Sequence, residues 1–355
     1  MLGLRSGSSR GVALIIVLWV VVIISVIALE FSYSTRIETD LTRNFFDGQK
    51  AYFGARSGIE RAVKEILRYR KAAKLLKDSE EELLWNLTGG PNQFNIGDMD
   101  ISVEIEPEDA RININDISKE YLKKIISNIG LTEEEADTII DSILDWQDGD
   151  DLHRMMGAEK DYYQELDTPY QAANSDIEIL EELLFIKGID KKLFYGEAAL
   201  PTVSDFVSGE NDGEERELRL KDGLSSIFTV YSGATSKDDK KQSKVNLNSA
   251  SLGVLMSLPL MDEGTAQIII DARKEEQITN VGYLVNLIGV PLYKSIQQYI
   301  TLKEADARYY TITSTAFSGE QDMSHSIRAV VDMKPKAGTG LSMPFNFVRW
   351  EDCKV

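Results

Sequence analysis

An uninterrupted apolar segment near the amino terminus constrains this chain more than any other feature. Residues 12–29 read VALIIVLWVVVIISVIAL, with no charge and with Ser25 as the one polar side chain. As an α-helix this segment would span about 27 Å, close to the ~30 Å hydrocarbon core of a bilayer. Arg5 and Arg10 precede it, and Glu30 is the first acidic residue. The segment predicts one membrane-spanning helix, with its leader in the cytoplasm and the bulk of the chain outside.

The pattern beyond the apolar segment predicts that the same helix continues. No proline occurs before Pro91, and apolar residues recur at spacings of four and seven, which gives one apolar stripe on a polar helix. A helix over 12–77 would be a rod of roughly 100 Å. Gly48, Gly54 and Gly58 either permit close packing or allow a bend, and the sequence leaves both possibilities open. The stripe comprises Ile37, Leu41, Phe45, Tyr52, Ile59 and Ile66.

A basic residue and a glycine stand directly before the apolar segment. An ordinary signal peptide has a shorter apolar stretch followed by small residues at its cleavage site, a pattern that is missing here. The sequence Arg10-Gly11-Val12 instead resembles the cleavage site of prepilins, where a peptidase cuts after the glycine and leaves the apolar helix on the mature protein. By this resemblance Gly11 ends the leader and Val12 begins the mature chain. A helix with an apolar half and an amphipathic half is the spine of a pilin.

The charge balance and the scarcity of histidine and cysteine argue against several classes of function. The 355 residues include 58 acidic and 39 basic residues, for a net charge of −19, which opposes binding to nucleic-acid phosphates. With Cys353 as the one cysteine, no intramolecular disulfide is possible. His153 and His325 are the only histidines, and the sequence contains no phosphate-binding glycine loop, zinc-ligand spacing or nucleophile elbow. We therefore expect no enzymatic activity.

Alternating segments predict a small antiparallel sheet whose strands are far apart in the sequence. Residues 101–105 alternate apolar and polar side chains, as in a half-buried strand. Residues 309–317 are rich in β-branched and aromatic side chains, and 327–333 alternates again after a short loop, which predicts a hairpin. A last strand is expected over 345–350. Packing this sheet on the amphipathic half of the long helix would bury both apolar faces.

A mostly helical stretch with an internal repeat lies between these strands. The first copy begins with Asn-Ile-Asn at 113–115 and the second with Asn-Leu-Asn at 246–248, and their later halves are 176–189 and 280–290. The two copies look like helix-hairpin-helix or SAM-like modules. The predicted fold class is therefore α+β, with a pilin-like long helix on a small antiparallel sheet and a large helical insertion of two such modules.

Helix-hairpin-helix modules often bind DNA phosphates through a glycine-flanked turn. In the second copy Leu260 and Asp262 occupy the expected glycine positions, and in the first copy residues 130–135 read Gly-Leu-Thr-Glu-Glu-Glu. Carboxylates at both turns would repel phosphate. We therefore interpret both modules as packing units and expect no nucleic-acid partner.

Taken in order, these motifs resemble general secretion pathway protein K, the large minor pseudopilin of type II secretion systems. The resemblance covers nearly the whole chain except 201–226 and the tail after Pro335. It implies processing by prepilin peptidase, a single-pass anchor in the inner membrane with the bulk in the periplasm, and I-type and J-type minor pseudopilins as partners. It also implies a place at the tip of the pseudopilus, which supports export of folded proteins across the outer membrane. The motifs are 10–12, 53–62 (FGARSGIERA), 145–148 (DWQD), 157–159 (GAE) and 245–250 (VNLNSA).

The fifth residue counted from Val12 is Ile16, where most pilins carry a glutamate. In pilins that carboxylate is thought to neutralise the amino-terminal ammonium of a neighbouring subunit. An unpaired charge in hydrocarbon costs at least ~2.5–3.5 kcal/mol, so a subunit without the carboxylate is least penalised where no subunit lies ahead of it. Ile16 thus favours the tip position. The alternative is that Ile16 is an ordinary apolar residue of the anchor.

A dense acidic segment is the candidate metal site. Hard oxygen ligands at this density fit calcium better than zinc, although the spacing is not that of an EF-hand and a solvated acidic loop is the alternative. The resemblance to protein K, whose relatives carry calcium in this region, favours calcium, which would cross-link a loop that has no disulfide. The expected ligands are Asp148, Asp150, Asp151 and Glu159, with Asp145 and Asp161 as further candidates.

Two other functions remain open from the sequence. One is a minor tip subunit of a type IV pilus or DNA-uptake filament, and the other is an uncleaved single-pass periplasmic scaffold. The predicted division of the chain is the same for the pseudopilin and for these two alternatives. The expected units are the leader 1–11, the spine helix and first strands 12–112, the first module with its acidic loop 113–200, an acidic loop and linking strand 201–243, the second module 244–305, and the last strands with the tail 306–355.

Overall fold

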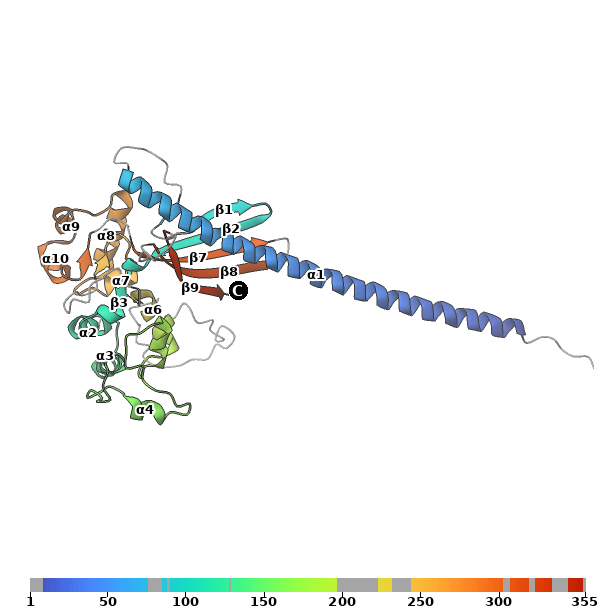
Figure 1. Ribbon diagram of the computed structural model, residues 1–355, viewed down its shortest axis with the longest axis horizontal. Coiled ribbons are helices and arrows are strands. Elements are labelled where there is room, and N and C mark those ends of the chain that lie inside the picture. The colour runs from blue at the N-terminus through green and yellow to red at the C-terminus, as the bar shows by residue number, and fades with distance from the viewer. Residues whose placement is uncertain are drawn as a thin grey trace, which may run out of the picture.

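Figure 1 shows the computed structural model of the chain. Two predicted features, the leader up to residue 8 and the acidic loop after residue 200, lie outside the described residues. The description covers residues 9–75, 85–87, 90–127, 129–196, 223–231, 244–302, 307–318, 323–333 and 344–353.

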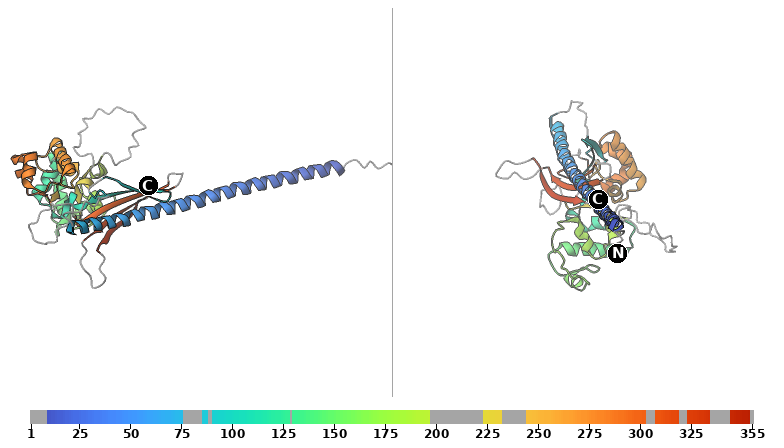
Figure 2. Two further views of the ribbon diagram at one scale, coloured as in Figure 1. Left: turned by 90° about the horizontal axis from the view of Figure 1, so that it is seen from above. Right: turned by 90° about the vertical axis from the view of Figure 1, so that its right-hand side faces the viewer.

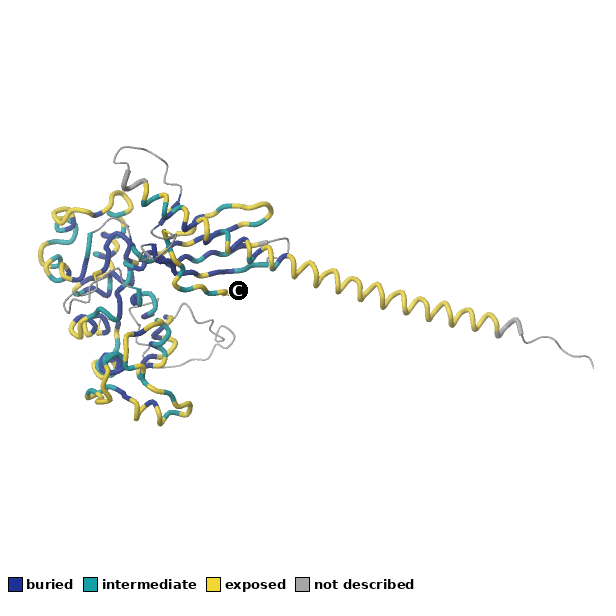
Figure 3. The backbone as a smooth tube through the Cα atoms, in the orientation of Figure 1, coloured by how far each residue is buried: buried dark blue, intermediate teal, exposed yellow. Residues whose placement is uncertain are grey.

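One unbroken helix, α1 (Ser9–Leu75), contains both the apolar segment and the amphipathic segment, as predicted. Its first part stands clear of the rest of the described chain (Figures 1 and 3), and Leu41 and Phe45 of the stripe are each 64% exposed. Further along the same stripe, Ile59 and Ile66 are fully buried. The chain therefore covers only the second half of the stripe with its own residues.

The second half of α1 packs on a five-stranded antiparallel sheet (Figures 1 and 2). Its strand order is β1-β2-β7-β8-β9. The predicted strands, including the last one, are confirmed, but β1 was not predicted from the sequence. This short edge strand is mostly polar, and its hairpin to the next strand turns at Gly97 in the left-handed region (φ 63°). The strands are β1 (Asn92–Ile96), β2 (Met99–Pro107), β7 (Tyr309–Ser318), β8 (Met323–Asp332) and β9 (Asn346–Cys353).

Glycines on the buried face of α1 serve close packing and not a bend. A Cβ atom at Gly58 would lie 2.0 Å from Ser314 Oγ and 2.9 Å from Val103 Cγ2, and one at Gly54 would lie 2.9 Å from Ala316 Cβ. The helix runs through both positions without a break. The backbone of α1 therefore approaches the sheet more closely than any side chain would allow.

The helical insertion has a hydrophobic core of its own, separate from the core under α1. Its two copies are closed in the same way. Asn115 Nδ2 donates to Ile177 O and Asn115 Oδ1 accepts from Ile177 N, both at 2.9 Å. Asn248 makes the same pair of bonds with Ile278, at 3.1 and 2.8 Å. The predicted repeat is thus confirmed, while its SAM-like character stays a prediction.

Each copy also ends with a short parallel bridge, β3 to β4 in the first and β5 to β6 in the second. The turn before the longest helix of each copy, α3 or α8, contains a residue with a left-handed backbone, Gly130 (φ 95°) or Leu260 (φ 61°). In the second copy a leucine therefore adopts a conformation that favours glycine, as predicted for Leu260. The first copy comprises β3 (Ile112–Asn113), η2 (Ile114–Asp116), α2 (Lys119–Ser127), α3 (Glu133–Gln147), α4 (Lys160–Gln164), η3 (Leu180–Phe185), α5 (Lys191–Tyr195), α6 (Leu224–Ile227) and β4 (Phe228–Thr229). The second comprises β5 (Val245–Asn246), α7 (Leu252–Met256), α8 (Glu263–Glu275), α9 (Val281–Ile288), α10 (Val290–Ile296) and β6 (Ile300–Thr301).

A short 3₁₀ turn, η1 (Glu108–Ala110), connects the sheet to the insertion. The Glu108 carboxylate is 2% exposed and accepts hydrogen bonds from Thr229 of the first copy and Thr311 of the sheet. Asp109 accepts from Asn246 Nδ2 at 3.2 Å, in the second copy. This turn therefore contacts all three parts of the molecule outside α1.

Replacing Gly58 with alanine is expected to destabilise the packing of α1 on the sheet. The added methyl would overlap Ser314 and Val103, and the cost of such overpacking, typically ~1–3 kcal/mol, exceeds the gain in helix propensity of up to ~1 kcal/mol. Thermal unfolding of the detergent-solubilised chain, followed by tryptophan fluorescence, would show a lower midpoint. Gly48→Ala is the matched control, because its nearest neighbour would be Met323 Cε at 3.8 Å. An equal loss in both variants would contradict this account.

Candidate metal centre

The acidic segment is held between the end of α3 and the start of α4. Thr132 and Glu135 cap the first turn of α3 reciprocally. Asp148 is the C-cap of this helix, and its backbone N donates to Leu144 O at 3.1 Å. Trp146 at the end of α3 and Tyr163 in α4 pack edge to face, with ring centroids 5.3 Å apart. The loop therefore starts from a fixed helix end, and an aromatic contact joins the two helices that flank it.

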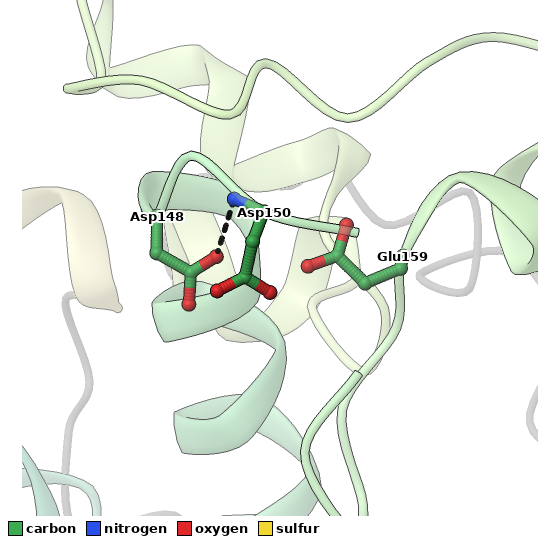
Figure 4. A group of neighbouring side chains, drawn as sticks. All are labelled: Asp148, Asp150 and Glu159. Atoms are coloured by element: carbon green, nitrogen blue, oxygen red, sulfur yellow. Dashed lines mark hydrogen bonds between the residues drawn. The ribbon is translucent and has the colours of Figure 1, made fainter. Parts of the chain in front are cut away.

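Three carboxylates converge in this loop (Figure 4). Oxygen atoms of Asp148, Asp150 and Glu159 lie within 4.8 Å of one another. The backbone of the loop is turned by its own acids, since Asp150 N donates to Asp148 Oδ1 at 3.4 Å and Leu152 N donates to Asp150 Oδ1 at 2.9 Å. The arrangement directs several negative charges at one point.

Glu159 is the most constrained of the three. The residue is 4% exposed. Neither of its carboxylate oxygens has a hydrogen-bond partner among the described residues. Burial, together with the charges of the four aspartates in 145–151, raises the pKa of Glu159 to about 7. A buried carboxylate with no donor is costly, and a bound cation would remove both the charge repulsion and the missing contacts.

Arg154 holds the two aspartates at the end of α3 in place. Its guanidinium Nη1 donates to Asp145 Oδ1 and Asp148 Oδ2, and its backbone N donates to Asp145 Oδ2 at 3.0 Å. Gly157 must be a glycine here, because a Cβ atom would lie 1.9 Å from Asp145 Oδ2. One positive charge thus neutralises part of the acidic segment and leaves the remaining acids in excess.

The structure brings three of the six predicted ligands together and places the other three outside the group. Asp148, Asp150 and Glu159 form the group, whereas Asp145 is fully buried and engaged by Arg154. Asp151 Oδ1 accepts from Asn174 Nδ2 at 3.3 Å. Asp161 is exposed on the first turn of α4, outside the group. The sequence pattern gave no signal for Arg154 or Asn174, because neither belongs to the acidic run.

The donor set fits a hard divalent cation. All donors in the group are carboxylate oxygens, which suit calcium or magnesium, whereas zinc in proteins takes mainly nitrogen and sulfur ligands. The described residues contain no other group of three or more histidine, cysteine or acidic side chains with this spacing. The buried and unpartnered oxygens of Glu159 are the observation that favours a bound cation over a solvated loop.

The predicted processing and anchor residues lie at the start of α1. Gly11 and Val12 belong to its first turns, and Ile16 is 57% exposed on its apolar part. Among the described helices, α1 is the one long and apolar enough to cross a membrane, and its apolar window is not buried against the rest of the chain. This supports the prediction of a single-pass anchor.

Comparison with known proteins agrees with this architecture. The family described as "Type II secretion system (T2SS), protein K" matches residues 92–204, from β1 to just beyond α5. A solved structure, the GspK-GspI-GspJ complex of enterotoxigenic Escherichia coli, contains a chain with the same fold, with a TM-score of 0.55 at 15% identity over 88% of this chain and 99% of that one. The resemblance to type II secretion system protein K is confirmed.

Curated relatives carry the same name. "Type II secretion system protein K" of Pseudomonas aeruginosa is 25% identical over 288 residues, which is 77% of this chain and 74% of that protein. "Putative type II secretion system protein K" of Escherichia coli K12 is 25% identical over 203 residues. That match spans 53% of this chain and 61% of the relative, less than two thirds of its length. The similarity to protein K therefore extends well beyond the region that the family description matches.

In the calcium-free chain, Glu159 is expected to make stability fall as pH rises. Its pKa is about 7 in the folded chain against an ordinary value of 4.5, so between these values the folded state retains a proton that the unfolded state has lost. The resulting stability is complete below pH 4.5 and is lost as pH rises through about 7. Thermal unfolding in excess chelator, measured across this range, would show the fall in the wild type.

The Glu159→Gln variant has no such proton to lose, so its midpoint should fall less over the same range. Glu165→Gln, at an exposed glutamate after α4, serves as the control and should follow the wild type. A fall that is equally steep in Glu159→Gln would contradict the assignment to this carboxyl.

Proposed function

We propose that this chain is a minor pseudopilin of a type II secretion system, with a structural role in assembly and no enzymatic activity. The observation that carries the proposal is the single unbroken α1, whose apolar end is uncovered and whose other end packs on the sheet. In this proposal α1 anchors the subunit in the inner membrane, and the sheet and the helical insertion lie in the periplasm.

The uncovered part of α1 supports assembly with other pseudopilins. Between the membrane segment and the sheet, apolar side chains such as Phe31, Leu41 and Phe45 are 64–73% exposed. An apolar surface of this size on a rod is unfavourable in water and is stabilised by contact with other helices. The related chain of known structure was solved in a GspK-GspI-GspJ complex, so I-type and J-type minor pseudopilins are the partners we propose.

The shape of the molecule supports a place at the tip of the pseudopilus. The helical insertion forms a wide head at the end of the chain farthest from the apolar part of α1 (Figures 1 and 2). Ile16 provides no carboxylate to neutralise the amino-terminal ammonium of a subunit ahead of it. An unpaired ammonium inside the membrane is costly. A head of this width with no such carboxylate suits the subunit that caps the assembly and supports protein export.

We expect prepilin peptidase to cut between Gly11 and Val12. Amino-terminal sequencing of the protein from cell membranes would then begin at Val12. Replacing Gly11 with leucine should block cleavage and leave the chain beginning at Met1, because by the resemblance the peptidase cuts after a glycine. Gly7→Leu, a second leader glycine, is the control and should be processed normally. A wild-type protein that begins at Met1 would support the uncleaved scaffold instead.

We further propose that Asp148, Asp150 and Glu159 hold calcium. These residues come from the end of α3, the loop and the residue before α4, so one cation would join both sides of the loop. The close oxygens and the unpartnered Glu159 support this proposal. Bound calcium would cross-link a segment that has no disulfide among its residues.

Calcium should raise the melting temperature of the chain, since a ligand that binds only the folded state stabilises it by about 2.7 kcal/mol at a hundredfold excess over Kd. Differential scanning fluorimetry with calcium or with chelator measures the shift. Asp150→Asn should abolish most of it by removing a ligand charge. Asp161→Asn changes an acid outside the group and should keep the wild-type shift. No shift in the wild type, or an equal loss in Asp161→Asn, would contradict the site.

A further inference from the structure

The segment that returns from α4 to the core contains a residue with an unusual backbone conformation. Asn174 has φ 47°, in the left-handed region, and Leu260 is the other described non-glycine residue with a positive φ. Asparagine tolerates this region better than most residues, because its short polar side chain can bond locally. Three residues later the backbone is fixed, since Ile177 exchanges two hydrogen bonds with Asn115. The conformation at Asn174 therefore places a side chain just before a rigid point.

The side-chain amide of Asn174 is oriented by the acidic loop. Its Nδ2 donates to Asp150 O at 3.0 Å and to Asp151 Oδ1 at 3.3 Å. Because both contacts are to acceptors, they fix which end of the amide carries the nitrogen. The other atom of the amide is therefore the carbonyl oxygen Oδ1, which makes neither of these two contacts.

That oxygen atom is buried and has no hydrogen-bond partner among the described residues. Within that part of the chain, buried carboxylate and amide oxygens without a partner occur at Glu159, on both oxygens, and at Asn174. These atoms can only accept, so each requires a donor or a cation. Asn174 and Glu159 both lie beside the same acidic loop. Asn174 donates hydrogen bonds to Asp150 and Asp151, and the charges of the same two aspartates act on Glu159. One bound cation would satisfy the unpartnered oxygens together.

We propose that Asn174 Oδ1 is a further ligand of the cation held by Asp148, Asp150 and Glu159. The inference rests on the proposed calcium site and adds a neutral oxygen from the segment that follows α4. Calcium takes six to eight oxygen ligands, including asparagine carbonyls, so the three carboxylates leave coordination positions open. Through Asn174 the cation joins the end of α3 to the segment that enters the Asn115–Ile177 link.

The experiment uses terbium(III) as a luminescent substitute for calcium on the full chain in detergent. Asn174→Gly removes the amide without backbone strain, because glycine adopts a positive φ freely. Leu260→Gly is the matched control, since it relieves the same left-handed conformation in the copy without the acidic loop. The measurements are the Kd for calcium, from competition with terbium, and the number of waters on bound terbium, from luminescence lifetimes in H₂O and D₂O.

Asn174→Gly should weaken calcium binding by about tenfold or more, and the bound terbium should gain a water in place of the lost oxygen. Leu260→Gly should match the wild type in both measurements. An unchanged Kd in Asn174→Gly overturns the inference, and so does a weaker Kd with an unchanged number of waters, because Asn174 would then only position the loop. A wild-type chain that binds neither ion overturns the calcium site itself, and the inference with it.

Discussion

The position of the head relative to the rod depends on one buried carboxylate. Glu108 lies between two hydrophobic cores that share no buried residue, and it accepts hydrogen bonds from Thr229 on one side and Thr311 on the other. Arg111 Nη1 lies 3.6 Å from Glu108 Oε1 and balances its charge. Loss of a partner from such a buried network leaves an uncompensated charge, so the two cores are held in a fixed relation by polar contacts.

Other polar contacts reinforce this joint at its edge. Arg349 on β9 donates to both carboxylate oxygens of Glu181 in η3, at 3.0 and 3.2 Å, and Glu351 lies beside it. A bidentate pair of this kind is geometrically specific. Together with the glycine-mediated packing of α1 on the sheet, this ion pair connects α1, the sheet and the first copy.

Long-range periodicity carried most of the fold information in the sequence. The 67-residue α1 was predictable because its spacing is helical throughout and no proline interrupts it. The edge strand β1 was not, because a short polar strand has no alternation to detect. In the metal centre, the acids were visible as a dense run, but which of them converge depends on Arg154 engaging Asp145 and on Asn174 arriving from 24 residues beyond Asp150. Such contacts are set by tertiary structure.

The paired asparagine closures show where the two copies differ in chain length. In the second copy the chain passes from the end of α8 at Glu275 to Ile278 almost directly, whereas in the first copy the whole acidic loop and α4 intervene before Ile177. Both copies nevertheless close at an equivalent backbone point. Since the entropy of closing a loop grows slowly with its length, a duplicated scaffold could accept an insertion in one copy without loss of either core. The repeat thus separates the residues that close each copy from the acidic loop that distinguishes the first copy.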